Sequence, residues 1–183
     1  LPINELALQP YQQIAHRLPA LRPKQFDIVP IEHLALSARM DGSLGVNRYP
    51  GKPKIAATTD REAIESWLAL KGSSTHTTRS YRAQAERFLL WALFEREIPL
   101  SSLMPEDCAA YVRFLEDLGG PKAHWSWNRP LEDWVGPKSN KRWHPDWKPF
   151  TGSLTQSSRR QAIVIVKSMC AFLARSRYLQ DDP

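Results

Sequence analysis

Hydroxyl and arginine side chains gather in one short stretch where a helix is expected to begin. The N-terminus of a helix has free backbone N–H groups and the positive end of the helix dipole, and both favour phosphate. Hydroxyl and guanidinium groups add further donors to phosphate oxygens. We interpret the stretch as a phosphate-contacting cluster, with a plain helix cap and solvated arginines as the alternative. The cluster consists of Thr75, Thr77, Thr78, Arg79 and Arg82.

A second cluster of this kind stands near the start of the last expected helix. It consists of Ser157, Arg159, Arg160 and Lys167. Arg160 and Lys167 lie about two helical turns apart and therefore share a helix face. Side chains at the start of a helix that enters a DNA groove can contact base edges as well as phosphates. A solvated polar face is the alternative here.

Residues 119–150 are rich in Trp and Pro and offer two further kinds of chemistry. Tryptophan side chains can stack on bases, but duplex DNA hides the base faces and Trp is usually buried. His124, His144, Asp133 and Asp146 are metal-ligating residue types, but they lack ligand spacing. We therefore expect no metal and no cofactor.

The two cysteines, Cys108 and Cys170, lie in apolar helical contexts without a C-x-x-C pairing. This pattern favours two reduced thiols in the core of a cytoplasmic protein, with a disulfide or a metal pair as the alternative. No apolar run approaches the ~20 residues that span a bilayer, so we expect no membrane partner.

The net charge of +6 suits a nucleic-acid partner, but it is unevenly distributed. Residues 56–118 hold ten acidic and seven basic residues, whereas the stretches on either side are net basic. A DNA-binding surface must therefore be built from local clusters. We expect Glu65, on a largely acidic helix, to lie away from DNA.

Capping residues and apolar spacing predict four main helices, near residues 60–71, 76–97, 105–118 and 155–177. Thr59 and Glu62 form a capping-box pattern, and Pro105 suits the first turn of a helix. Ile64, Trp67 and similarly spaced apolar residues give each helix a core face. Seven prolines in residues 1–55 predict an irregular arm with at most one short helix, around residues 5–17.

Several short segments follow one another along the chain in a characteristic order. They are Thr77-Thr78-Arg79-Ser80-Tyr81 leading to Phe88 and Trp91, Leu103-Met104-Pro105-Glu106-Asp107 followed by Tyr111 and Phe114-Leu115, Ser157-Ser158-Arg159-Arg160 leading to Phe172-Leu173 and Tyr178-Leu179, and the final Leu179-Gln180-Asp181-Asp182-Pro183. In this order and spacing, residues 58–183 resemble the core-binding, SAM-like domain that precedes the catalytic domain in tyrosine recombinases, the phage integrase family.

The resemblance implies an all-α fold, a four-helix SAM-like core-binding bundle over residues 56–183. The irregular N-terminal arm of residues 1–55 and the Trp/Pro-rich insertion of residues 119–150, before the last helix, are departures from the family pattern. The implied partners are double-stranded DNA and, in the full-length protein, other recombinase protomers. The implied role is to clamp the recombination-site duplex for DNA integration and recombination.

Catalysis in that family uses a tyrosine nucleophile with arginine, lysine and histidine side chains around the scissile phosphate. The resemblance implies that these come from a separate domain that would follow Pro183, so we expect no catalytic residue in this chain. His76 and Arg79 match the His-x-x-Arg spacing of that active site, and Tyr111 lies downstream. We interpret this match as coincidental. Tyr111 falls on an apolar stripe, and too few residues precede His76 to form the catalytic fold.

The alternative function is a helical SAM-like protein-interaction domain without DNA-binding activity, because such bundles also mediate assembly. An intact small enzyme is a third reading, and the lack of a convincing pair of nucleophile and base disfavours it.

Overall fold

The main helices lie where the caps and apolar spacing predict them, within two residues at each end once the π-helical turn that follows the second helix is counted with it. The computed structural model describes residues 27–71 and 74–183. Within these ranges it is helical, with isolated β-bridges and no strand, which confirms the all-α class. The four longest helices are α2 (Asp60–Ala69), α3 (Thr75–Trp91), α4 (Pro105–Asp117) and α6 (Gln156–Arg175).

Helix α2 begins with the predicted capping box. The Thr59 hydroxyl accepts a hydrogen bond from the Glu62 N–H at 3.3 Å, and the Glu62 carboxylate accepts one from the Thr59 N–H at 3.3 Å. Ile64, Trp67 and Leu68 are buried on one face, as their spacing predicts. The Thr59 cap satisfies one of the free N–H groups of the first turn, and the apolar face turns toward the bundle core.

Helix α3 continues into a π-helical turn, η3 (Ala92–Arg96), so that the two together match the predicted helix 76–97. Glu97 ends this run in the left-handed conformation, with φ of 56°. A short 3₁₀ turn, η4 (Leu100–Ser102), leads to α4, whose first residue is Pro105 as predicted.

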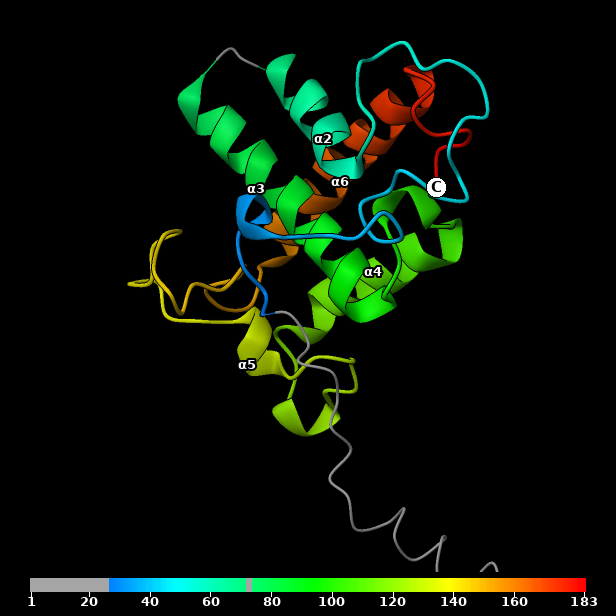
Figure 1. Cartoon of the computed structure of the whole chain (residues 1–183). Coiled ribbons are helices and arrows are strands. Elements are labelled where there is room, and N and C mark those ends of the chain that lie inside the picture. The colour runs from blue at the N-terminus through cyan, green and yellow to red at the C-terminus, as the bar shows by residue number, and fades with distance from the viewer. Residues whose placement is uncertain (1–26, 72–73) are drawn as a thin grey trace, which may run out of the picture.

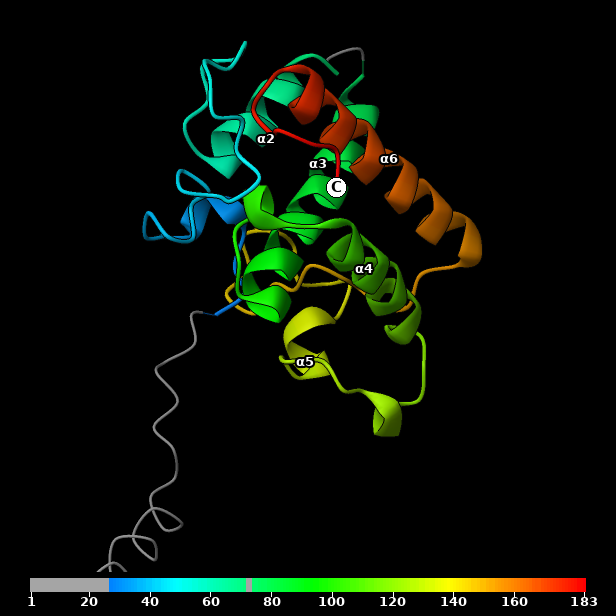
Figure 2. The same cartoon turned by 90° about the vertical axis from the view of Figure 1, so that its right-hand side faces the viewer.

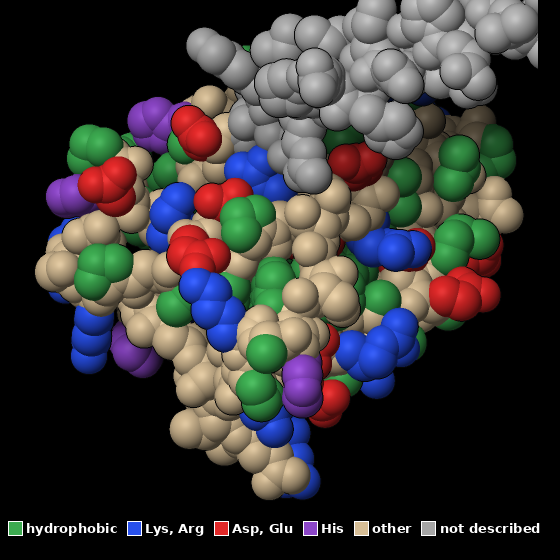
Figure 3. Space-filling model, turned by 90° about the horizontal axis from the view of Figure 1, so that it is seen from below, with side chains coloured by type: hydrophobic (Ala, Val, Ile, Leu, Met, Phe, Trp, Pro, Cys, Tyr) green, Lys and Arg blue, Asp and Glu red, His purple; other side chains and the backbone are tan. Residues whose placement is uncertain are grey.

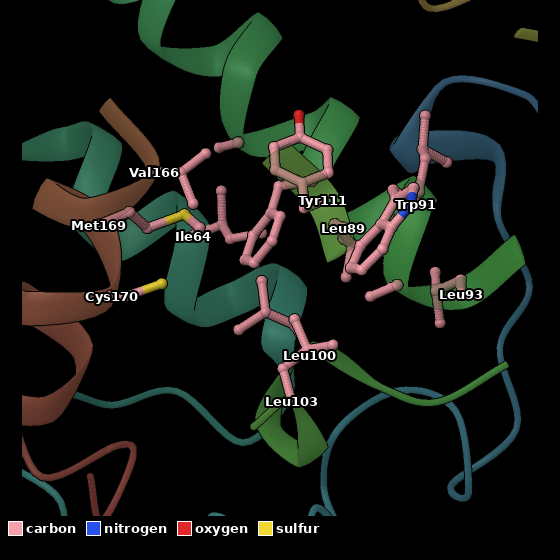
Figure 4. Close-up of a cluster of buried hydrophobic side chains, with 14 of the residues drawn as sticks. Ile64, Leu89, Trp91, Leu93, Leu100, Leu103, Tyr111, Val166, Met169 and Cys170 are labelled. Carbon is pink, nitrogen blue, oxygen red and sulfur yellow. The ribbon is translucent and has the colours of Figure 1, made fainter. Parts of the chain in front are cut away.

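Helix α6 is the longest helix and packs against α2, α3 and α4. Figures 1 and 2 show α3 running down from the upper end of the bundle, while α6 rises to that end. The buried side chains between these helices form the core (Figure 4). Its largest members include Trp67, Trp91, Phe88, Tyr111 and Phe114.

The described part of the predicted arm packs on the bundle. Ile28 is buried, and so is Ile31, in the 3₁₀ turn η2 (Ile31–His33), whose backbone N–H donates to Glu86 of α3. Further along, the Asn47 side chain bonds with the backbone of Asp181 in both directions. The short helix expected around residues 5–17 lies outside the described residues.

A buried carboxylate ties this N-terminal segment to both α2 and the chain end. Asp60 accepts hydrogen bonds from the Tyr178 hydroxyl at 2.8 Å and the Ser101 N–H at 3.1 Å. Gly42 has φ of 89°, and a Cβ built there would lie 2.1 Å from Asp60 Cγ, so the close approach requires glycine. Burial raises the pKa of Asp60 to about 6, against the lowering effect of these hydrogen bonds.

The Trp/Pro-rich segment is folded against the lower end of the bundle (Figure 1). It contains the turn η5 (Lys122–His124) and the short helix α5 (Leu131–Trp134). The Glu95 carboxylate holds it by accepting from the Trp134 indole at 2.6 Å and from the Asn128 N–H at 2.6 Å. The segment therefore packs down on the bundle, as its apolar content predicts.

Candidate nucleic-acid interface

The first turn of α3 is capped by Ser74, whose hydroxyl accepts from the Thr77 N–H at 3.1 Å and donates to the Thr77 hydroxyl at 2.8 Å. Thr75 and Arg79 are exposed, and Thr78 is partly buried. The hydroxyl of Thr77 is thus engaged in the cap. The side chains of Thr75 and Arg79 are the ones that the structure presents most fully to solvent in this cluster.

Arg82 is held against the neighbouring helix. Its guanidinium donates to both carboxylate oxygens of Glu65 on α2, at 2.7 and 2.9 Å. This hydrogen-bonded pairing raises the pKa of Arg82. Arg82 is therefore not a free cation beside Arg79, and Glu65 lies within the predicted cluster rather than away from it.

The first turn of α6 is built in the same way. The Thr155 hydroxyl accepts from the Ser158 N–H at 3.1 Å and donates to the Ser158 hydroxyl at 2.9 Å. Arg159 is partly buried and donates to the Leu154 carbonyl at 2.9 Å. Ser157, Arg160 and Lys167 are exposed. The second cluster therefore presents two cationic side chains, Arg160 and Lys167, to solvent.

One further basic residue extends this second cluster. Arg175 is exposed in the last turn of α6, eight residues after Lys167. Arg160, Lys167 and Arg175 thus recur every two turns or so along the solvent face. The repeated seven- to eight-residue spacing was the available sequence signal, and Arg175 is the member that the sequence interpretation left out. Val164 lies among them, 65% exposed.

Charge is segregated between the helices. Helix α6 contains four basic residues and no acidic residue, and the one acidic residue of α3, Glu86, is buried. Helices α2 and α4 carry an excess of acidic residues. The net basic helices α3 and α6 are packing neighbours in the bundle. The lower face of the molecule, in contrast, mixes basic and acidic side chains (Figure 3).

The structure does not bring the first turns of α3 and α6 together. The first turn of α3 lies at the upper end of the bundle in Figures 1 and 2, and that of α6 lies well below it. The row of basic residues on α6 rises toward the upper end, where Arg175 stands. The two predicted clusters therefore lie apart and do not form one site.

The residues that match the spacing of the recombinase active site, His76, Arg79 and Tyr111, do not form a reactive group. The ring of Tyr111 is buried between Phe88 and Trp91, with ring centroids 4.8 and 5.2 Å away (Figure 4). Its hydroxyl has no hydrogen-bond partner among the described residues, and burial raises its pKa. His76 and Arg79 stand instead at the exposed start of α3. A nucleophilic tyrosine needs an accessible hydroxyl, which Tyr111 lacks.

The metal-ligating residue types of the Trp/Pro-rich segment do not converge. Asp133 pairs with Arg129 at 2.8 Å, and His144 lies 3.9 Å from Asp146. Over residues 27–71 and 74–183 no group of three or more His, Cys, Asp or Glu residues is placed to hold a metal ion. The two cysteines are free thiols, and burial raises the pKa of Cys108 to about 11.

No family model, curated protein or solved structure matches the chain. In the described part of the chain, no helix has the length and apolar character needed to cross a bilayer.

Proposed function

We propose that the chain binds duplex DNA through α6 and the first turn of α3, as the core-binding part of a site-specific tyrosine recombinase. The observation that carries the proposal is the row of Arg160, Lys167 and Arg175 on a helix without acidic residues. Lys and Arg side chains that neutralise phosphates supply most of the affinity in such complexes.

The length of the row suits a duplex. Arg160 and Arg175 are separated by fifteen residues, which is about 22 Å along a helix axis. The major groove is about 12 Å wide, so side chains at the two ends of α6 can reach phosphates on both of its edges. The helix face between them would then lie over the groove, with Lys167 and Val164 nearest to it.

The first turn of α3 adds a phosphate site of a different kind. Its N–H groups and dipole favour an anion, and Thr75 and Arg79 supply exposed donors beside them. This end of α3 and the end of α6 both lie at the upper end of the bundle, with α2 between them (Figure 1), so a backbone contact here would be separate from the row. Arg79 is therefore assigned to a phosphate, and Arg160 is the first choice for a contact with base edges.

A protein-interaction module is the second candidate, and one feature favours it. A hollow of about 240 Å³ opens between α4 and α6, walled by apolar side chains that include Val112, Ile163 and Val166. An apolar side chain of a partner would fit there. Such a module would show no salt-dependent affinity for DNA.

The test compares single alanine variants on and off the proposed face. Arg160→Ala and Lys167→Ala should weaken duplex binding at low salt, and each should reduce the log–log salt slope by about 0.9 if it removes one phosphate contact. Arg113→Ala, an exposed arginine on the acidic helix α4, is the matched control and should bind as the parent does. Fluorescence anisotropy with a labelled duplex measures these affinities.

Equal affinity of the parent and the two α6 variants would contradict the proposal, and so would an equal loss in Arg113→Ala. Circular dichroism confirms that each variant is folded. If Arg160→Ala loses more on one sequence than on a scrambled duplex, by about 1–3 kcal/mol, Arg160 contacts bases.

A further inference from the structure

The loop of residues 137–149 presents one tryptophan to solvent. Trp143 is 70% exposed, whereas every other tryptophan in the described residues is buried or partly buried. Figure 1 shows this loop, in yellow, projecting from the side of the bundle below α3. A large flat apolar side chain left in water has a cost that a ligand with an apolar face would remove.

The loop is rigidly anchored by the residue next to Trp143. The Arg142 guanidinium donates to both oxygens of the buried Glu86 carboxylate, at 2.5 and 2.7 Å, and to Glu32 at 2.5 Å. Backbone hydrogen bonds at Asn140, His144 and Trp147 close successive turns of the loop. The loop backbone around Trp143 is therefore anchored to the bundle, with Arg142 turned inward and Trp143 exposed.

The surroundings of Trp143 favour an anionic aromatic ligand. Lys138 and Lys141 are exposed in the same loop, and Asp146 is its one acidic residue. The His33 ring meets the indole edge-on, with centroids 5.6 Å apart. A hollow of about 160 Å³ beside them is walled by Arg142, His144 and Trp147, among others. Aromatic platforms flanked by cations are the usual means of binding unpaired nucleotides.

We propose that this loop is a second nucleic-acid site, which takes an unpaired base on Trp143 and its flanking phosphates on Lys138 and Lys141. Duplex DNA keeps its base faces stacked, so only a single-stranded or unpaired nucleotide offers the indole a partner. The site is separate from the face of α6 and does not depend on duplex binding there. The loop leads through Phe150 and Thr155 into the first turn of α6.

The test titrates the whole chain with labelled oligothymidylate and with a fully paired duplex of equal length. Trp143→Ala should weaken oligothymidylate binding about 5- to 150-fold, the range expected for loss of stacking on one base. The duplex affinity of this variant should change by less than about twofold, because paired bases have no free face to stack on the indole. Trp143→Phe should keep most of the affinity. Lys141→Gln should reduce the salt slope for the single strand by about 0.7.

Two controls separate this site from the duplex face. Leu44→Ala removes an equally exposed apolar side chain, 70% exposed in a different loop, and should leave both affinities unchanged. Arg160→Ala should weaken duplex binding and spare oligothymidylate. If the parent bound oligothymidylate through Trp143 but did not bind duplex, the proposed function would fall and this site would stand.

Three results would overturn the proposal. They are no binding of oligothymidylate by the parent, unchanged binding in Trp143→Ala, and equal losses on the single strand and the duplex. The last would place Trp143 against the sugar-phosphate backbone. Because Trp143 is 70% exposed, the alanine variant should fold, and circular dichroism checks that it does.

Discussion

Arg82 on α3 and Glu65 on α2 form a two-fold hydrogen-bonded ion pair, with N–O distances of 2.7 and 2.9 Å. Arg82 lies one to two turns after the start of α3, and both side chains of the pair are partly exposed. In the proposed complex, Glu65 would compete with phosphate for the guanidinium of Arg82 and would therefore restrain DNA binding.

Replacement of Glu65 should accordingly strengthen DNA binding. Glu65→Ala removes a negative charge and releases Arg82, so the salt slope should steepen by about 0.9 if Arg82 then contacts one phosphate. The free energy of unfolding should fall by no more than about 1 kcal/mol, because the pair is partly exposed. Duplex titrations over a salt series measure the effect. Unchanged affinity in Glu65→Ala, together with a clear loss in Arg82→Ala, would show that the pair opens in the parent.

Tyr111 and Tyr178 should respond in opposite ways to loss of their hydroxyls. The Tyr111 hydroxyl is buried without a partner among the described residues, so Tyr111→Phe should leave stability unchanged or raise it. Tyr178 donates to Asp60 at 2.8 Å, and Tyr178→Phe should lower the free energy of unfolding by about 1–3 kcal/mol. Urea denaturation of the two variants measures both values. A larger loss in Tyr111→Phe than in Tyr178→Phe would contradict the packing described for them.

Asp60 should make stability depend on pH. Burial raises its folded pKa to about 6 from the usual 3.8, so the folded state binds the proton more tightly than the unfolded state. The stability that protonated Asp60 contributes is therefore complete below about pH 4 and is lost as the pH rises through 6. The total change is about 3 kcal/mol. In Asp60→Asn this slope should vanish, which urea denaturation at several pH values would show as a changing difference from the parent. A constant difference between pH 4 and 7 would contradict it.

Arg142 should matter far more to stability than its exposed neighbour. Arg142→Ala leaves Glu86 as a buried charge without its cationic partner, and losses of about 3–5 kcal/mol are typical of such changes. Lys141→Ala, one residue away and exposed, should change the free energy of unfolding by less than about 0.5 kcal/mol. Thermal or urea unfolding distinguishes the two, and similar values for both variants would argue against the anchoring role of Arg142.

The helices were predictable from the sequence because their signals are local. The capping box at Thr59 and Glu62, the first-turn Pro105 and the apolar spacing on α6 each act within one or two turns. The pairing of Arg82 with Glu65 and of Arg142 with Glu86 was not predictable, because the partners lie 17 and 56 residues apart. Which arginines are left without a carboxylate partner depends on how the helices pack. Helix packing therefore determines which arginines of the candidate site can contact a ligand.

The most direct test of duplex binding is the salt dependence of the parent chain's affinity for DNA. With four to six phosphate contacts, the plot of log K against log salt should have a slope of roughly −4 to −5. A slope near zero, or no binding of duplex at low salt, would contradict the assignment of α6 and the start of α3 to DNA and would favour the protein-interaction module.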